Sequence, residues 1–410
     1  MINIAIMGYG VVGSGVAEVC QMNQAIMKQR TGYQIKIKKI LDIRDFPDDP
    51  FGDRITHNPD DIFSDPDISI VVETIGGTSI AYKLSVQALK AGKHLITSNK
   101  ELVAAHGPEL MALARKKNVN YFFEASVGGG IPIIRPLHKS LAANEIRLIA
   151  GILNGTTNYI LTRMDEAGIT FEQALSEAQS KGYAEQDPTE DLNGSDACRK
   201  LAILASITTG QYVDYRKIYS EGITNILSTD LLYAHSLNMK LKLISRFKLL
   251  PDHRADMIVA PMLIGRNHPI AAADDVNNAI LIEGNALGEA MFYGQGAGKL
   301  PTASAVVADI ISCAMHLDRV RYLSEWVIPE QEILRDHGEC SVQALVRFSN
   351  GLSAAQVRQV FDVYGAKPVK AQAQNEHAWL IGTASKLTEQ QLASHISSFG
   401  EQVLSRIRLY

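Results

Sequence analysis

Cysteine is scarce in this 410-residue chain, and the sequence lacks basic tracts and long apolar runs. The four cysteines lie far apart and form no Cys-x-x-Cys pair, which argues against a disulfide framework or a zinc site and favours the reducing cytoplasm. No apolar run reaches the roughly 18 residues that a membrane-spanning helix needs. Because no Lys/Arg tract is present and the formal net charge is −4, nucleic acid is not an expected partner.

What the chain does have is the composition of an ordinary globular protein, with 46% hydrophobic and 20% charged residues. Its length fits about two or three domains. The first opens with an apolar run over residues 2–7, followed by Gly8, Gly10 and Gly13 and then by helical periodicity. In this Gly-x-Gly-x-x-Gly pattern the first glycine permits a tight turn, the second lets the backbone approach a pyrophosphate, and the third lets the helix pack on the strand. The pattern therefore predicts a dinucleotide-binding turn.

Strand-like and helix-like segments then alternate as far as about residue 130. This order predicts an α/β fold whose N-terminal domain, residues 1–130, is a Rossmann-like, doubly wound parallel sheet. Ligands bind beyond the carboxyl ends of the strands in such sheets. We therefore expect Thr74, Ser98, Asn99, Lys100 and Glu124, which follow predicted strands, at the ligand edge.

The residues after the second predicted strand bear on which dinucleotide is bound. Asp42 is placed to accept a hydrogen bond from a ribose hydroxyl, as in NAD sites, whereas Arg44 is placed to bind the 2′-phosphate of NADP. The two signals conflict, so their spacing leaves both NAD and NADP open.

An acid-rich stretch, GYAEQDPTEDLNGSDACRK, occupies residues 182–200 and leads into an almost wholly apolar helical segment. Asn193 or Ser195 is expected to cap that helix, which places Asp196 and Lys200 four residues apart on one face. A solvated, helix-stabilising ion pair is one explanation and would contribute only about 0.3–0.5 kcal/mol. An acid cluster with one amine also suits a substrate that carries an ammonium group and a reactive carbonyl.

Seven motifs occur along the chain in the order GYGVVG, ETIGG, TSNKELVA, FEASVGGGIPII, GILNGTTNYIL, the stretch quoted above and YGQGAGKLPTASAVVAD. On these motifs, in this order, the chain resembles the homoserine dehydrogenase family from residue 2 to about residue 319. The resemblance implies an NAD(P)-dependent oxidoreductase acting on a CH–OH group. Such an enzyme reduces L-aspartate 4-semialdehyde to L-homoserine, on the route to threonine and methionine, by hydride transfer with a lysine as general acid.

The resemblance also implies roles for single residues of the substrate pocket. Lys200 corresponds to the family's catalytic lysine and proton donor. Lys100 corresponds to the second lysine of the site, beside the nicotinamide. Glu185 matches the glutamate that holds the substrate amino group. The expected substrate-binding residues are Glu185, Asp191, Asp196 and Gly182.

A cofactor site and a cation site follow from the same resemblance. The residues expected at the cofactor are Gly8, Gly10, Val12, Gly13, Arg44, Thr74, Ser98, Lys100 and Gly298. Arg44 matches an arginine of the family, which slightly favours NADP, while Asp42 replaces a usually apolar residue and keeps NAD open. Backbone carbonyls of the family hold a monovalent cation, usually sodium, at the positions of Glu124, Val127, Gly129 and Ile131. A homodimer or larger homo-oligomer is also implied.

The rest of the chain is expected to form two further domains. Residues 131–320 should form an α+β domain for substrate binding and dimerisation, with its last helix returning to the first domain. Residues 338–410 show a β-α-β-β-α-β pattern that resembles an ACT domain, an amino-acid-sensing module. The usual Pro-Gly turn after its first strand is missing, with FSNGLS in its place, so we expect little or no response to threonine. We also expect that removal of residues 339–410 leaves an active dimer.

Two other functions are compatible with parts of the sequence. A thiol-dependent semialdehyde dehydrogenase needs a nucleophilic cysteine in a reactive loop, and Cys198, its only candidate, lies within the apolar helical segment. A nucleotide-dependent amino-acid sensor would bind its ligands without turnover, against which Lys100 and Lys200 argue. An assay of NADPH oxidation with aspartate semialdehyde distinguishes the three functions.

Overall fold

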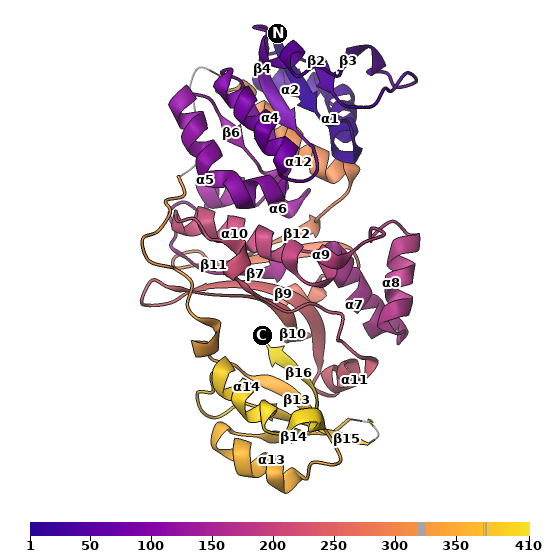
Figure 1. The fold of residues 1–410 in the computed structure, drawn as a ribbon, viewed down its shortest axis with the longest axis vertical. Coiled ribbons are helices and arrows are strands. Elements are labelled where there is room, and N and C mark those ends of the chain that lie inside the picture. Colours follow the sequence, from indigo (N-terminus) through magenta and orange to yellow (C-terminus); the bar gives the residue numbers. More distant parts are fainter. Residues whose placement is uncertain (318–324, 372, 374) are drawn as a thin grey trace. The chain divides into compact units, whose positions relative to one another are not determined.

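The computed structural model describes residues 1–317, 325–371, 373 and 375–410, so the predicted domain end at residue 320 and the end of the resemblance near residue 319 lie outside the described residues. The chain divides into two compact units (Figure 1). Unit 1 comprises residues 1–145, 202–215 and 294–330, and unit 2 comprises residues 146–201, 216–293 and 331–410. Each unit is therefore assembled from separate pieces of the chain.

Unit 1 contains a sheet of parallel strands in the order β3-β2-β1-β4-β5-β6. Its strands are β1 (Ile2–Met7), β2 (Ile35–Leu41), β3 (Ile55–Thr56), β4 (Ile68–Glu73), β5 (His94–Thr97) and β6 (Tyr121–Phe122). The central strands β1, β4 and β5 are buried at nearly every position, as expected where helices cover both faces of a sheet. The predicted Rossmann-like, doubly wound sheet is confirmed.

Helices cover this sheet, and one of them comes from a distant part of the sequence. The helices wholly within unit 1 are α1 (Val11–Met22), α2 (Gln24–Thr31), α3 (Asp60–Phe63), α4 (Ser79–Lys90), α5 (Lys100–Lys117), α6 (Ala125–Gly128) and α12 (Lys299–Ala314). Helix α12, drawn in orange among the indigo and purple elements of Figure 1, packs against α1. The two helices approach closely because α1 has Gly15 there, and a Cβ on Gly15 would lie 2.8 Å from the carbonyl oxygen of Lys299.

Unit 2 is built on a mixed sheet with the strand order β12-β11-β7-β9-β10-β16-β13-β15-β14, and β8 also pairs with β10. Its strands are β7 (Ile146–Ile152), β8 (Tyr219–Ser220), β9 (Met239–Leu249), β10 (Ala255–Gly265), β11 (Asn277–Gly284), β12 (Gly288–Gln295), β13 (Ala344–Ser349), β14 (Lys367–Val369), β15 (Glu376–Ile381) and β16 (Val403–Leu409). β9 and β10 pair antiparallel along their whole length. β10 is buried at every position except its last, which makes it the centre of this unit.

Several helices of unit 2 begin at strong capping residues. They are α7 (Gly155–Ala167), α8 (Phe171–Ser180), α9 (Thr189–Leu192), α11 (Ser228–Ser236), α13 (Ala354–Phe361) and α14 (Glu389–Ser397), while α10 (Ser195–Thr209) begins in unit 2 and ends in unit 1. Thr170, Ser353 and Thr388 each form a capping box with a glutamine three residues later, at the starts of α8, α13 and α14. None of the described helices combines the length and the apolar character needed to cross a bilayer.

The C-terminal strands continue the sheet of unit 2. β16 pairs in parallel with β10, where Met262 and Leu263 lie opposite Arg408 and Leu409, and antiparallel with β13 on its other side. The elements from β13 to β16 follow the order β-α-β-β-α-β around an apolar core that includes Trp379. The relation of this segment to ACT domains stays a prediction.

Candidate active site

Three glycines, two between β1 and α1 and one in the first turn of α1, shape the turn that the sequence predicts as dinucleotide-binding. Gly8 has a φ of +92°, which residues with side chains rarely adopt, and a Cβ on Gly13 would collide with the carbonyl oxygen of Gly8. Gly10 faces open space, with nothing within 4 Å of its Cβ position. Val12 is half-buried against the apolar core of unit 1. The turn is therefore tight, packed against its own helix, and open where a pyrophosphate would approach the N-terminus of α1.

Asp42 and Arg44, which gave conflicting predictions for the cofactor, form one ion pair. Arg44 donates from Nε and Nη2 to the two oxygens of the Asp42 carboxylate, at 3.0 and 3.2 Å. The same carboxylate accepts a hydrogen bond from the backbone N–H of Tyr9 at 2.7 Å, which ties the end of β2 to the glycine turn. Burial opposes the ionisation of Asp42, but its hydrogen bonds from Arg44 and Tyr9 outweigh burial and lower its pKa to about 2. The protein itself thus holds Asp42 as an anion, while the Arg44 side chain stays 58% exposed.

Glu73, at the end of β4, is a residue of the ligand edge that the motifs did not single out. Its buried carboxylate accepts hydrogen bonds from the backbone N–H of Ile75 at 2.6 Å and from the hydroxyl of Thr97 at 2.5 Å. Burial raises its pKa to about 7 against the effect of these bonds. The neighbouring Thr74 donates its hydroxyl to the carbonyl oxygen of Gly8 at 2.7 Å, so the ends of β1 and β4 are fastened together. An acid at the end of an otherwise apolar strand is the signal that identifies Glu73.

The turn after β5 places the predicted cofactor residues Ser98 and Lys100. Between them, Asn99 caps α5 by accepting a hydrogen bond from the backbone N–H of Leu102 at 3.0 Å. The amide of Asn99 also donates to the carbonyl oxygen of Ile75 at 2.9 Å. Lys100 is the first residue of α5. The loops that follow β4 and β5 are therefore bonded to each other at the carboxyl edge of the sheet.

The loop predicted to hold a cation, residues 124–131, is ordered by the side chain of Glu124. The carboxylate of Glu124 accepts hydrogen bonds from the backbone N–H groups of residues 133–135, at 2.7, 2.9 and 2.8 Å. Gly129 has a φ of +56°, and a Cβ there would collide with the backbone of Gly296. Because the Glu124 carboxylate is committed to the backbone, the groups of this loop that can serve a cation are main-chain carbonyls. The predicted ones belong to Glu124, Val127, Gly129 and Ile131.

The glycine-rich turn before α12 lies against this loop. The backbone N–H of Gly130 donates to the carbonyl oxygen of Gln295 at 3.1 Å. Gly298 precedes the first residue of α12 and has a φ of +116°. It is exposed, so the N-terminus of α12 is open to a ligand.

A buried polar cluster in unit 2 joins two predicted substrate acids to the predicted catalytic lysine. Lys200, which is 9% exposed, donates from Nζ to Asp196 Oδ2 and to the carbonyl oxygen of Leu153, both at 2.7 Å. The amide of Asn154 donates to the same oxygen of Asp196 at 2.9 Å and to Asp191 Oδ1 at 2.7 Å. One asparagine thus bridges two carboxylates, and one lysine offsets the charge of one of them.

The surroundings of Asp191 oppose its ionisation. Burial and the neighbouring Asp196 raise the pKa of Asp191, and the hydrogen bond from Asn154 and the charge of Lys200 only partly offset them. Lys200 donates its hydrogen bond to Asp196, the other acid of the pair. A second ammonium group bound beside Asp191 would therefore stabilise the cluster.

Helix caps at both sides fix the positions of these groups. Asn154 precedes α7, and its Oδ1 accepts a hydrogen bond from the backbone N–H of Thr157 at 2.9 Å, which leaves Nδ2 for the two acids. Asn193 Oδ1 accepts from the backbone N–H of Ser195 at 2.9 Å, at the start of α10. Asp196 is only 4% exposed. The solvated surface pair that the sequence left open for Asp196 is therefore excluded.

Two other predicted substrate residues, Gly182 and Glu185, are not bonded to this cluster. Both lie on the exposed segment between α8 and α9. Gly182 has a φ of +73°, and its N–H donates to the carbonyl oxygen of Gln179 at 3.0 Å. Gln179 also donates from Nε2 to the backbone carbonyl of Glu185 at 3.2 Å. The backbone of Glu185 is therefore held in place by Gln179, while its carboxylate is exposed to solvent.

Cys198, the candidate nucleophile of the thiol alternative, is buried on α10 with 3% exposure. Burial raises its pKa to about 11, so the thiol stays protonated and unreactive at neutral pH. The other three cysteines are also free and buried. Within the described part of the chain, no group of three or more His, Cys, Asp or Glu side chains is arranged to hold a metal ion.

Two family models match the sequence. The model described as "Homoserine dehydrogenase, NAD binding domain" matches residues 8–124, and the model described as "Homoserine dehydrogenase" matches residues 132–311. The first match contains the glycine turn and the second contains the buried acid cluster.

Individual proteins agree with these models. A homoserine dehydrogenase of Pseudomonas aeruginosa is 42% identical over 311 residues, which cover 76% of this chain and 71% of that protein. The crystal structure of a homoserine dehydrogenase from Thiobacillus denitrificans is 33% identical, with a TM-score of 0.90 over 100% of this chain and 98% of that chain. A hyperthermophilic archaeal homoserine dehydrogenase in complex with NADPH is 27% identical, with a TM-score of 0.65 over 78% of this chain and 99% of that chain.

Proposed function

The chain belongs to the homoserine dehydrogenase family and is an NAD(P)-dependent oxidoreductase, and from this premise we propose how its side chains carry out the reaction. A homoserine dehydrogenase reduces the aldehyde of L-aspartate 4-semialdehyde to the alcohol of L-homoserine. The bound dinucleotide supplies the hydride. The protein must bind the substrate ammonium group, orient the aldehyde and provide a proton for its oxygen. The observation that carries the proposal is the buried cluster of Lys200, Asp196, Asn154 and Asp191.

Asp191 and Asp196 bind the substrate ammonium group in this proposal. Lys200 donates to Asp196, and Asn154 bridges the two carboxylates and holds them within reach of one shared donor. Glu185, whose side chain is exposed, supplies a further carboxylate to the ammonium group. Neither alternative function is favoured, because the family matches point to a dehydrogenase and the thiol of Cys198 is buried and protonated.

Lys200 is the proposed proton donor. Within the described residues, two of its three N–H bonds are directed to Asp196 and Leu153, which leaves one for the substrate oxygen. The ammonium group stabilises the negative charge that develops on the aldehyde oxygen as the hydride arrives, and then transfers a proton to that oxygen. Lys100, at the start of α5, is the proposed second lysine and serves the nicotinamide end of the cofactor.

The dinucleotide is assigned to the turn formed by Gly8, Gly10 and Gly13, with its pyrophosphate at the N-terminus of α1. The other proposed contacts are Val12, Thr74, Ser98 and Gly298. We favour NADP(H) over NAD(H), because the exposed guanidinium of Arg44 lies at the end of β2 and offsets the charge of Asp42. The Phe46 ring, with its centre 5.1 Å from that guanidinium, supports Arg44 in this position.

A monovalent cation, sodium, is proposed at the loop of residues 124–131. The Glu124 carboxylate already binds backbone N–H groups, so the ligands are neutral carbonyl oxygens, which can replace the hydration shell of such an ion. The cation would hold the loop against the turn before α12, which approaches it at Gly129.

We further propose that the protein is a homodimer or larger homo-oligomer of the cytoplasm, where its four buried cysteines remain reduced. β12 is the last strand of the sheet order on one side, and its Met291 and Tyr293 are 41% and 54% exposed. An exposed apolar edge strand favours aggregation unless it is covered, and a second copy would cover it. Light scattering at micromolar concentration tests this, since a monomer would contradict it.

The catalytic assignment is tested by following NADPH oxidation with aspartate semialdehyde. Lys200→Ala should bind NADPH normally and lose about 100- to 10,000-fold in kcat, the usual range for a general acid. Arg199→Ala is the matched control, because Arg199 pairs with Glu190 at 2.7 Å outside the acid cluster. Normal turnover in Lys200→Ala would overturn its role. If only Lys100→Ala loses activity, Lys100 is the proton donor and Lys200 is the second lysine of the site.

A further inference from the structure

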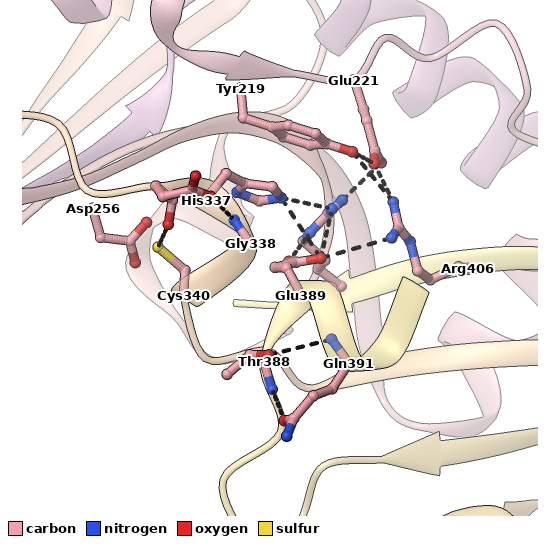
Figure 2. Close-up of polar contacts among 12 residues, drawn as sticks. Tyr219, Glu221, Asp256, His337, Gly338, Cys340, Thr388, Glu389, Gln391 and Arg406 are labelled. Atoms are coloured by element: carbon pink, nitrogen blue, oxygen red, sulfur yellow. Dashed lines mark hydrogen bonds and ion pairs between the residues drawn. The ribbon is translucent and has the colours of Figure 1, made fainter. Parts of the chain in front are cut away.

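The C-terminal strand, β16, carries two arginines that bind acidic side chains from other parts of unit 2. Arg408, which is 3% exposed, donates to Glu221 Oε2 at 2.7 Å and to the two oxygens of Glu389 at 2.6 and 3.0 Å. Arg406 pairs with the other oxygen of Glu221. Figure 2 shows Glu221, Glu389 and Arg406 pointing toward one another. Both arginines of β16 therefore hold Glu221 at once.

The surroundings of Glu221 fix it further. It directly follows β8, and its backbone N–H donates to the carbonyl oxygen of Val259 in β10 at 2.8 Å. Beside it, the ring of Tyr219 stacks on that of His337 with 3.6 Å between ring centres. Burial opposes ionisation of Glu221, but the guanidinium groups of β16 outweigh burial and lower the pKa of this carboxyl. Glu221 is thus an anion with a defined position.

The chain on either side of this glutamate contacts the turn of residues 192–194. Ser220 donates its hydroxyl to the carbonyl oxygen of Asn193 at 2.9 Å. Ile223 donates its backbone N–H to the carbonyl oxygen of Leu192, also at 2.9 Å. The approach is so close that a Cβ on Gly222 would collide with the same carbonyl group. Any movement of residues 220–223 must therefore move the turn.

We propose that Glu221 is a positioning residue of the substrate site, held in place by β16. The turn that it supports lies between Asp191 and Asp196 in the sequence, so the position of the turn sets the separation of the two carboxylates that Asn154 bridges. The inference rests on the proposed role of these acids in binding the substrate ammonium group. It gives the C-terminal strand a part in substrate affinity, although no residue of that strand belongs to the acid cluster.

Glu221→Gln is the direct test, because glutamine keeps the shape of the side chain and removes the charge that pairs with both arginines, while Glu389 keeps its own bonds to Arg408. Once residues 220–223 are less firmly held, the carboxylates of Asp191 and Asp196 lose their spacing. We expect KM for aspartate semialdehyde to rise about five- to tenfold, with kcat changed less than about twofold and KM for NADPH unchanged.

Asp230→Asn is the matched control, because it breaks another buried ion pair between α11 and the C-terminal strands. Asp230, which is 0% exposed, accepts hydrogen bonds from Arg347 of β13 and from Ser405 of β16, both at 2.7 Å. None of these bonds involves the turn of residues 192–194. If Glu221 had only a structural role, both variants would have a lower Tm and the same KM as each other. The positioning role requires that KM rises in Glu221→Gln and not in Asp230→Asn.

Asp196→Asn, measured alongside, separates this inference from the proposed function. A normal KM and kcat in Asp196→Asn would show that the acid cluster is not the substrate site. Impairment of Asp196→Asn together with a wild-type KM in Glu221→Gln would overturn the positioning role alone. If Glu221→Gln does not fold, Arg406→Gln gives the same readout, since Arg406 is 20% exposed and provides one of the two pairings. An unchanged KM in that variant would likewise overturn the inference.

Discussion

Glu73→Gln is a substitution whose effect follows directly from the structure. The Glu73 carboxyl is 0% exposed at the end of β4 and is bonded to Ile75 and Thr97. A glutamine can make both contacts, because its oxygen can accept from the backbone N–H of Ile75 and its amide can donate to the hydroxyl of Thr97. It cannot take up or release a proton. The substitution therefore isolates the effect of the proton on Glu73.

The magnitude follows from the pKa of Glu73, which burial raises from 4.5 to about 7. Because the folded protein holds this proton more tightly than the unfolded chain, the contribution of Glu73 to stability is complete below pH 4.5 and is lost as the pH rises through 7. A pKa difference of roughly 2.5 corresponds to ~3 kcal/mol. Between pH 4.5 and pH 7, the free energy of unfolding of the wild type should therefore fall by ~3 kcal/mol more than that of Glu73→Gln.

Urea unfolding of both proteins across this pH range provides the measurement, under conditions where fluorescence and circular dichroism report the same transition. Glu166→Gln, at an exposed position, is the control and should follow the wild-type profile. An infrared difference spectrum between the two proteins adds a direct readout, since at pH 6 Glu73→Gln should lack the protonated-carboxyl band of Glu73. Asp309, whose pKa burial also raises to about 7, contributes equally to both spectra. Parallel stability profiles for the wild type and Glu73→Gln would refute the reasoning.

Three further predictions concern the cofactor, the substrate and the C-terminal strands. Arg44→Ala should raise KM for NADPH about tenfold or more and leave KM for NADH nearly unchanged, because it removes the proposed ligand of the 2′-phosphate; equal effects on both cofactors would favour an NAD enzyme. Glu185→Gln should raise KM for the semialdehyde more than it lowers kcat. A change only in KM for NADPH would show that Glu185 does not belong to the substrate pocket. Deletion of residues 339–410 should destabilise unit 2, since the buried Asp230 would lose its arginine partner at a cost of about 3–5 kcal/mol and Glu221 would lose both of its arginines. A stable, active truncated protein would contradict this last expectation and support the separable module that the sequence suggests.

Features that depend on neighbouring residues could be predicted from the sequence. The turn at Gly8 and Gly13 follows from local sterics, and the alternation of strands and helices gave the parallel sheet of unit 1. Asp196 and Lys200 had to share a face of α10, because four residues make about one turn of helix. What their spacing did not show is that this face is buried.

Contacts between distant residues had no local signal. Asn154, which bridges the two acids, precedes Asp196 by 42 residues and has the sequence context of an ordinary helix cap. Asp42 and Arg44 looked like competing signals because spacing does not show that their side chains bond to each other. The continuation of the sheet from β10 to β16 was equally hidden, since parallel strands can be joined by any long connection.

The pairing of β10 with β16 also has a consequence for protein synthesis. More than one hundred residues separate the two strands, and a ribosome adds roughly 5–20 residues per second. The edge of β10 at Met262 and Leu263 therefore stays open for on the order of ten seconds in each nascent chain. The sequence around it, MIVAPMLI, is apolar and rich in strand-forming residues, which makes it prone to pair with other nascent chains. Pro261 removes one hydrogen-bond donor from this strand and so protects the growing chain until β16 emerges.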